Sequence, residues 1–331
     1  MPKRSILLTL KNAGLDGFLL ALVSSVILAY FWYEPGAYDG AVSLNSIGKY
    51  GVSVIFFFYG LKLSPTKLRA GLSNWWLHIV IQLATFIIFP TTALVVMFAA
   101  GGDADNLLWL GFFFLACLPS TVSSSVVMVS IAKGNIPAAI FNASISAIIG
   151  VFITPLWMGI FLATSSSGMD LGSVIISLIL QVLAPVMLGM LLNRKFGKIA
   201  DKHKNSLRIF DQAIIVTIIY CSFCESFANN MFSEFTIWGI ILLGAAMVAF
   251  LFLVYGIVFA TCKALHFNRE DKITALFCGS KKSLVHGTVM SKVLFPHFTS
   301  VGIILLPLML YHALQLMIVS VIARGMARKG T

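Results

Sequence analysis

Long apolar segments follow one another along almost the whole chain of 331 residues, and this pattern constrains the fold more than any other feature. A helix needs about 20 apolar residues to cross the hydrocarbon core of a bilayer. Ten segments are long enough, and charged residues or glycine, proline and asparagine bound each of them. They cover approximately residues 15–34, 45–63, 72–100, 107–132, 136–165, 170–193, 208–230, 235–263, 271–294 and 298–324. The sequence therefore predicts an all-α polytopic membrane protein with ten transmembrane helices.

The charged residues are few and unevenly placed. Only 11% of the residues are charged, whereas about a quarter are charged in soluble domains, so a soluble enzyme is excluded. The net charge of +11 would suit a nucleic-acid-binding protein, but most of the 23 lysines and arginines, such as Lys62 and Arg208, fall in connections on one side of the predicted helices. Cytoplasmic loops are enriched in lysine and arginine. We therefore expect both termini in the cytoplasm and no nucleic-acid partner.

The sequence offers no recognisable catalytic or metal-binding chemistry. Most of the five cysteines lie in apolar stretches without the histidine or cysteine partners of a metal site. Cys221 and Cys224 have the spacing of a redox pair, but they lie in a hydrophobic run without the strands of a redox domain. No acid/base pair and no nucleophile elbow is present. We therefore predict that the protein is not an enzyme and holds no cofactor, with a sodium ion as the one open possibility.

The fourth and ninth spans are each interrupted by polar residues at their centres. The fourth contains Pro119 followed by a run of hydroxyl residues, and the ninth contains Lys281 and Lys282 after a glycine and a serine. Proline removes a backbone donor and disrupts the preceding turn, and neighbouring hydroxyls can occupy the freed backbone groups, so the fourth span is expected to be discontinuous. The glycine, serine and lysines at the centre of the ninth span predict an interruption there as well. They are the fourth of the first five spans and the fourth of the second five. Because five is odd, residues 1–168 and 169–331 would form two inverted five-helix repeats, as in secondary transporters.

Several motifs in these regions are similar to those of a known transporter family. They are Leu-Pro-Ser-Thr-Val-Ser-Ser-Ser at 118–125, Ala-Lys-Gly-Asn at 132–135, Ile-Phe-Asn-Ala-Ser at 140–144, Thr-Pro at 154–155 and Phe-Cys-Gly-Ser-Lys-Lys-Ser at 277–283. The chain resembles the bile acid:sodium symporter family, and within it the sodium bile acid symporter-like branch, over nearly its whole length. The resemblance implies a panel domain and a core domain, with the fourth and ninth helices crossing at their unwound centres. Members of the main branch couple sodium to the uptake of bile acids and other organic anions.

The resemblance also implies ion-binding positions. It places sodium ligands on hydroxyl and amide side chains of the third, fourth and fifth spans: Gln82, Ser124, Ser125, Asn142 and Ser144. Thr85 is an alternative to Gln82, because the spacing from Gln82 to Pro90 differs from that of the main branch.

The ninth span departs from the main branch. Where that branch has a sodium-binding glutamate followed by Gln-Asn, this chain has Gly279, Ser280 and then two lysines. A missing carboxylate and an added ammonium both oppose a bound cation. We expect one of Lys281 and Lys282 to line a central cavity, since adjacent helical residues point about 100° apart. That lysine would attract an anion, or occupy the vacated cation site and exchange a proton; the alternative is a structural lysine bonded to carbonyls and hydroxyls of the break.

The candidate substrate cavity takes its residues from the two interrupted spans. They are Thr121, Ser123, Ser280, Lys281, Lys282, Ser283 and His286. His286 lies one turn beyond the lysines and could relay protons, whereas a packing histidine is the alternative.

These observations predict a symporter-like secondary transporter of bile-acid-like or other small organic anions. It would work by alternating access in the bacterial inner membrane, in contact with membrane lipid. Coupling to sodium and coupling to protons through Lys281 or Lys282 both stay open. The competing hypothesis is a non-transporting regulator of ion homeostasis, or a receptor, on the same fold.

Overall fold

A computed structural model describes residues 17–38, 43–62, 74–163, 176–177, 179–233, 235–296, 298 and 300–328. All regular secondary structure in these ranges is helical. The first half of the chain forms α2 (Gly17–Phe31), α3 (Glu34–Ala37), α4 (Leu44–Lys62), α6 (Trp75–Leu83), the π-helix η1 (Ala84–Ile88), α7 (Phe89–Ala99), α8 (Leu107–Cys117), α9 (Ser123–Ile131) and α10 (Ile136–Ala163). The second half forms the π-helix η2 (Ile179–Leu183), α12 (Ala184–Lys202), α13 (Lys204–Ala228), α14 (Ile237–Ala264), α15 (Arg269–Gly279), α16 (Leu284–Leu294) and α17 (Val301–Arg328).

The helical stretches fit a membrane protein. Six of those described are long and apolar enough to cross a bilayer: Trp75–Ala99, Ile136–Leu162, Ile179–Lys202, Lys204–Ala228, Ile237–Ala264 and Val301–Arg328. The helices α2 and α8 are shorter and apolar. The all-helical, polytopic prediction is therefore confirmed, whereas the count of ten spans and the inverted repeat stay predictions.

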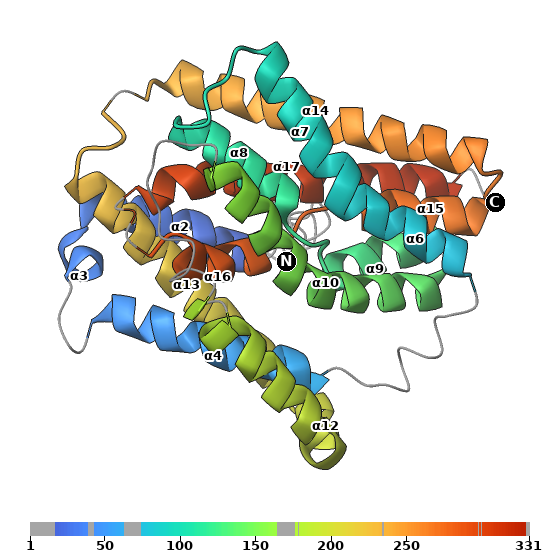
Figure 1. The fold of residues 1–331 in the computed structure, drawn as a ribbon, viewed down its shortest axis with the longest axis horizontal. Coiled ribbons are helices and arrows are strands. Elements are labelled where there is room, and N and C mark those ends of the chain that lie inside the picture. Colours follow the sequence, from blue (N-terminus) through green and yellow to red (C-terminus); the bar gives the residue numbers. More distant parts are fainter. Residues whose placement is uncertain are drawn as a thin grey trace, which may run out of the picture.

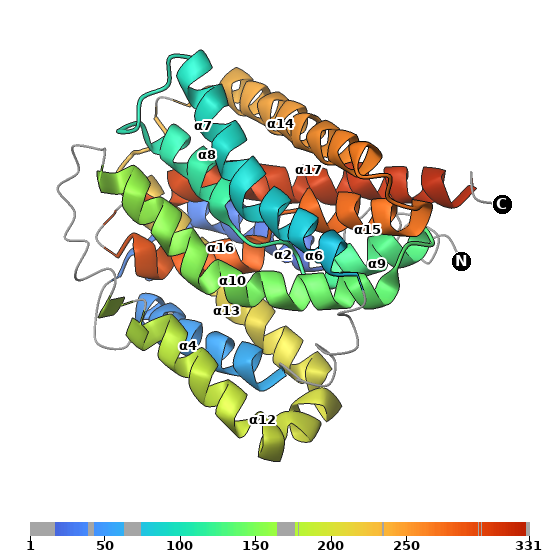
Figure 2. The same ribbon diagram turned by 45° about the vertical axis from the view of Figure 1, so that its right-hand side comes forward.

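The helices form two groups. The first consists of α2, α4, α12 and α13; both views show α4 and α12 side by side at the lower edge of the molecule, with α13 next to them (Figure 1, Figure 2). Glycines allow the close contact between α4 and α12. A Cβ atom added to Gly60 would lie 2.1 Å from the carbonyl oxygen of Val186, and one added to Gly189 would lie 2.1 Å from that of Phe57. Small residues bring helix backbones together in this way in membranes.

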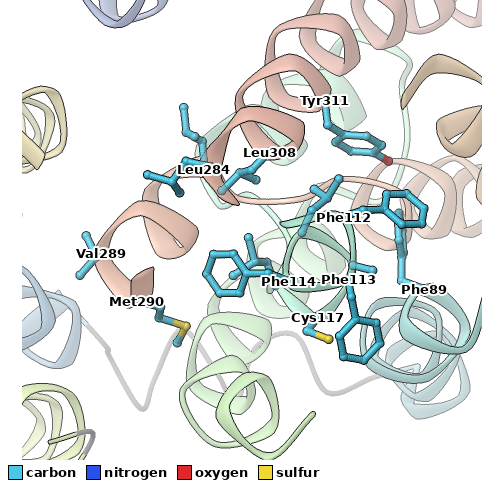
Figure 3. Packing of buried hydrophobic residues seen from close by; sticks show 14 of the residues in the cluster. Phe89, Phe112, Phe113, Phe114, Cys117, Leu284, Val289, Met290, Leu308 and Tyr311 are labelled. Atoms are coloured by element: carbon cyan, nitrogen blue, oxygen red, sulfur yellow. The ribbon is translucent and has the colours of Figure 1, made fainter. Parts of the chain in front are cut away.

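The second group contains the remaining long helices and holds most of the buried apolar side chains. Its centre is the contact of α17 with α8 and α14. Phenylalanines at 112–114 of α8 are buried there, packed near Phe89 and Tyr311 on one side and near Leu284 and Leu308 on the other (Figure 3). Some of the aromatic rings meet edge to face, as Phe112 and Phe250 do with ring centroids 4.6 Å apart, whereas Phe113 stacks on Phe161. This group holds both interrupted spans.

The predicted interruptions of the fourth and ninth spans are confirmed. The chain leaves helical structure between Cys117 and Ser123, and again between Gly279 and Leu284. The two breaks touch, because the backbone N–H of Ser283 donates to the carbonyl oxygen of Pro119 over 3.0 Å. Interrupted backbone at membrane depth needs such internal partners, since lipid offers none.

Candidate functional site

Three carbonyl groups at the end of α8 accept hydrogen bonds from side chains outside that helix. Helices leave their last carbonyls unpaired, and Pro119 cannot continue the ladder. The carbonyl oxygens of Ala116 and Leu118 each accept a hydrogen bond from Lys282 Nζ at 2.7 Å. The carbonyl oxygen between them, on Cys117, accepts from Thr154 Oγ1 at 2.7 Å. The end of α8 is therefore fixed by side chains from α10 and from the second break.

Lys282 has a third carbonyl partner, which comes from the π-helix η1. Its Nζ donates to the carbonyl oxygen of Thr85 at 2.7 Å and lies 4.1 Å from the ring centroid of Phe89. In a π-helix the carbonyl of residue i pairs with the N–H of residue i+5, as Ala84 does with Phe89. The next pair would need an N–H from Pro90, which has none. The proline thus leaves the Thr85 carbonyl for the lysine.

The second break is held by side chains in the same way. Ser125 Oγ donates to the carbonyl oxygen of Phe277 at 3.2 Å, and the Tyr311 hydroxyl donates to that of Ser280 at 2.9 Å. Gln315 of α17 pairs with both backbone groups of Lys282: its Oε1 accepts from the N–H at 2.9 Å, and its Nε2 donates to the carbonyl at 2.7 Å. All of these groups are buried and cannot bond to water, so these hydrogen bonds satisfy polar groups that would otherwise be unpaired.

Lys281 points toward a different set of groups. Its Nζ donates to Ser124 Oγ at 2.6 Å. Ser124 Oγ donates in turn to Thr121 Oγ1 at 2.9 Å, and Thr121 and Ser125 share a hydrogen bond of 2.7 Å. The two adjacent lysines therefore have different surroundings, carbonyls for Lys282 and hydroxyls for Lys281.

A cavity of about 360 Å³ lies between the two groups of helices. One wall comes from α2, α4 and α13, and the other comes from both breaks and from α9, α10, α16 and α17. The lining residues are Phe18, Tyr59, Lys62, Thr121, Val122, Ser124, Ser144, Ala147, Arg208, Asp211, Gln212, Ile215, Ser283, Val285, His286, His312 and Leu316. Lys62 and Asp211 form a salt bridge of 3.2 Å in this wall. With Arg208 added, the lining has two cationic side chains and one anionic side chain.

His286 joins the two walls of the cavity. Its ring stacks on the ring of Tyr59, with centroids 4.9 Å apart and planes at 24°. Its Nδ1 is 2.9 Å from Ser283 Oγ, which also caps the start of α16 by accepting from the His286 N–H. The other ring nitrogen, Nε2, is buried and has no hydrogen-bond partner among the described residues.

The predicted cavity residues divide into two sets. Thr121, Ser283 and His286 line the cavity, as do Ser124 and Ser144, whereas Ser280, Lys281 and Lys282 are buried behind its wall. Ser280 Oγ bonds back to the carbonyl oxygen of Leu276 within its own helix. Ser123 begins α9, and its side chain lies outside the described part of the structure.

Four of the predicted ion-binding residues fall into two hydrogen-bonded groups. Ser124 and Ser125 belong to the group around Lys281. Asn142 instead accepts from Gln82 Nε2 at 3.0 Å and places its own Nδ2 2.8 Å from His78 Nδ1. Gln82 Oε1 is buried without a hydrogen-bond partner among the described residues. Thr85 Oγ1 bonds to the carbonyl of Ile81, and Ser144 Oγ to that of Ile140, both within their own helices.

Several residues of the site were not found from the sequence. Lys62 and Arg208 were assigned to the positive loops, and nothing in the sequence distinguished them from other loop cations. Gln315 and His312 lie in an otherwise apolar stretch of α17. Gln315 Nε2 is 2.9 Å from His312 Nδ1, and the same Gln315 side chain bonds to the backbone of the second break. An amide inside an apolar span was the available signal, because buried polar groups in membranes are costly without partners.

Comparison with known proteins identifies the family. A model of the SBF-like CPA transporter family matches residues 16–328. The chain belongs to this family. It is therefore an integral membrane protein of a transporter family, not an enzyme, and the resemblance drawn from the motifs is confirmed.

Curated relatives of this SBF-like chain align over nearly its whole length. An uncharacterized protein of Pseudomonas aeruginosa is 38% identical over 316 residues, 95% of this chain and 93% of the relative. The protein of Escherichia coli strain K12 named "Putative symporter YfeH" is 35% identical over 320 residues, 95% of this chain and 94% of the relative. Sodium/bile acid cotransporter 7-B of Xenopus laevis is 30% identical over 313 residues, 92% and 89% of the two chains.

Proposed function

We propose that this protein is a secondary transporter that carries small organic anions, bile-acid-like or simpler, across the bacterial inner membrane. It would cross the membrane ten times, as two inverted repeats over residues 1–168 and 169–331, with both termini in the cytoplasm. The observation that carries the proposal is the cavity between the two helix groups, lined by both helix breaks. Rocking of the group containing α4 and α13 against the group containing the breaks would expose this cavity to each side in turn.

The charges around the cavity favour an anion. Lys62 and Arg208 outnumber Asp211, which already pairs with Lys62. The half-helices α9 and α16 begin at Ser123 and Leu284, next to the lining residues Ser124 and Ser283, so their N-terminal dipole ends lie beside the cavity. Backbone N–H groups and the positive end of a helix dipole favour carboxylate, sulfonate or phosphate groups.

The other side chains of the lining favour an amphipathic solute. Phe18, Ile215, Val285 and Leu316 supply apolar surface, and Ser124 and Ser283 supply hydroxyl groups. A cavity of about 360 Å³ lies at the small end of the range for ligand pockets, which run from about 300 to 1,000 Å³. A compact carboxylate with an apolar body fits this combination.

We further propose that transport of the anion is coupled to protons. Sodium would not bind at the hydroxyl groups of the fourth span. Ser124 Oγ accepts a hydrogen bond from the Lys281 side chain at 2.6 Å. An ammonium at that position would repel sodium by several kcal/mol in a medium of low dielectric. A lysine that takes up a proton on one side of the membrane and releases it on the other would carry the coupling charge in place of sodium. Binding of the anion near Ser124 would then favour the protonated lysine.

The test is uptake into proteoliposomes. Labelled taurocholate and labelled small mono- and dicarboxylates are offered under a sodium gradient, a pH gradient or neither. We expect uptake to follow the pH gradient and to fall at least tenfold in Arg208→Gln. The control Lys198→Gln removes an exposed cation from α12, outside the cavity lining, and should transport as wild type.

Three outcomes separate the hypotheses. In Lys281→Gln, we expect the dependence on the pH gradient to disappear. Uptake that follows the sodium gradient and is unchanged in Lys281→Gln would refute the proton coupling. Saturable binding of an anion without uptake under any gradient would instead favour the receptor or regulator.

A further inference from the structure

Three backbone carbonyl oxygens converge on the side chain of Lys282 at the crossing of the helix breaks. They belong to Thr85, Ala116 and Leu118, and each lies 2.7 Å from Nζ. The ring of Phe89 covers the group, with its centroid 4.1 Å from Nζ. Lys282 is fully buried. We define these three carbonyls and this ring as the carbonyl cage.

The cage has the composition of a site for a monovalent cation. Carbonyl oxygens and an aromatic face both attract positive charge, and the end of α8 adds the negative end of a helix dipole. No carboxylate of the described residues takes part, because the partners of Lys282 Nζ are the three carbonyl oxygens and the ring of Phe89. A singly charged ion is therefore better matched to the cage than a divalent one, which needs carboxylate oxygens.

The number of acceptors shows which form of Lys282 fills the cage. An ammonium has three N–H donors, whereas a neutral amine has two N–H donors and a lone pair. Three carbonyl oxygens at hydrogen-bond distance use all three donors of the ammonium. A neutral amine would direct its lone pair at one of these oxygens, which is repulsive. The geometry thus matches a charged group held in a fixed position by the backbone.

The cage is also held open independently of the lysine. Pro90 lacks the N–H that would pair with Thr85, and Pro119 ends α8 so that its last carbonyls are free. Thr154 fixes the Cys117 carbonyl, which separates the two α8 members of the cage. Gln315 fixes the backbone of Lys282 itself. Removal of the lysine side chain would therefore leave the three carbonyls in place and without donors.

We propose that the carbonyl cage is a monovalent-cation site permanently filled by the tethered ammonium of Lys282. Without that side chain it binds free alkylammonium ions and, more weakly, sodium. This site rests on the proposed transport function and explains why no free cation is needed at the helix crossing. Its test measures ion binding and not transport, so its failure is distinguishable from failure of the transport proposal.

The experiment uses the purified full chain in detergent with Lys282→Ala. Truncation at Cβ removes three carbons and the amine, which is the composition of n-propylammonium. Thermal unfolding is followed with increasing n-propylammonium, sodium or tetramethylammonium chloride, and N-methyl-D-glucamine chloride keeps the ionic strength constant. The matched control is Lys281→Ala, which removes the adjacent buried ammonium but only one hydroxyl contact.

We expect n-propylammonium to raise the Tm of Lys282→Ala by several degrees in a saturable manner, as a ligand specific for the folded state does. Sodium should give a smaller rise. Tetramethylammonium, which has no N–H donor, should give none. Wild type should respond to none of the three, and Lys281→Ala should not respond to n-propylammonium. Equal responses of the two alanine variants, or no response of Lys282→Ala, would overturn the proposal.

A second pair of variants covers the case in which Lys282→Ala does not fold. Lys282→Met and Lys281→Met keep most of the side-chain volume and remove only the charge and the donors. Because three buried carbonyls lose their donors in one variant and one hydroxyl in the other, Lys282→Met should have the lower Tm. Equal Tm values for the two methionine variants would contradict a cage built around the Lys282 ammonium.

Discussion

Replacement of Asp271 by alanine should destabilise the protein strongly. Its carboxylate accepts hydrogen bonds from three asparagine side chains: Asn74 at 2.8 Å, Asn135 at 2.9 Å and Asn268 at 2.9 Å. Each asparagine uses its own side-chain oxygen to cap a helix start, those of α6, α10 and α15 respectively. One buried carboxylate therefore joins the N-terminal ends of three helices.

The size of the effect follows from these contacts. Hydrogen bonds to a charged group contribute about 1.5–3 kcal/mol each. Three would give roughly 4.5–9 kcal/mol, but the asparagines keep their capping bonds and can gain water at this helix end. Contributions of residues in one network are also not additive. We therefore expect a loss of about 3–5 kcal/mol, which at about 2 °C per kcal/mol for a chain of this size lowers Tm by roughly 6–10 °C.

The assay is thermal unfolding of the purified protein in one detergent, with Glu270→Ala as the matched control. Glu270 is the exposed neighbour of Asp271, and its backbone carbonyl, not its side chain, accepts the bonds in this region. The control should change stability by no more than about 0.5 kcal/mol. Asp271→Asn should fall between the two, because it keeps the shape but turns one acceptor into a donor. Equal Tm values for Asp271→Ala and Glu270→Ala would refute the reasoning.

Two further predictions concern packing and the second break. Gly60→Ala should lower the free energy of unfolding by about 1–3 kcal/mol, because the added Cβ would meet the carbonyl oxygen of Val186. The control Gly256→Ala in α14, where nothing lies within 4 Å of the added Cβ, should raise it by up to about 1 kcal/mol from helix propensity. Similar Tm values for the two variants would contradict the close contact of α4 and α12. Gln315→Leu should lose about 2–4 kcal/mol because the buried N–H and carbonyl of Lys282 both lose their partner. Unchanged thermal stability in Gln315→Leu would show that the second break does not need this clamp.

The sequence predicted the features that depend on segment length and on single residues. Apolar segments long enough to cross a bilayer predicted the helices, and Pro119 together with the polar centre of the ninth span predicted both interruptions. Both signals are local, since hydrocarbon thickness sets the length and a proline followed by a run of hydroxyl residues is a poor helix interior. Proline alone does not end a helix here, because Pro155 and Pro307 lie inside α10 and α17. The family resemblance rested on residues in these same segments.

The different surroundings of the two lysine side chains could not be predicted from the sequence. It depends on the carbonyl of Thr85, which is free because Pro90 stands at the fifth position after it in a π-helix. A π-helix differs from an α-helix by one extra residue in a turn, and the hydropathy pattern does not reveal that difference. The sequence showed that adjacent lysines must point apart, and only the packed structure showed that Lys282 meets carbonyls and Lys281 meets hydroxyls.

The cationic wall of the cavity was missed for a related reason. Lys62 and Arg208 fit the rule that lysine and arginine gather in cytoplasmic loops, so their sequence positions needed no other explanation. In the structure Lys62 ends α4 and Arg208 lies in the first turns of α13, and both side chains line the cavity. A lysine or arginine that fits the rule for cytoplasmic loops can also line a binding site. Only the tertiary packing shows which of these residues do so.

The most direct test of the account is a counterflow measurement. Proteoliposomes are loaded with a high concentration of one unlabelled organic anion and placed in a trace of the same labelled anion, with no ion gradient. A carrier with one alternately exposed cavity accumulates the label transiently, and we expect this for wild type but not for the double variant Lys62→Gln, Arg208→Gln. No transient accumulation of any organic anion, or the same accumulation in the double variant, would contradict transport through the cavity between the two helix groups.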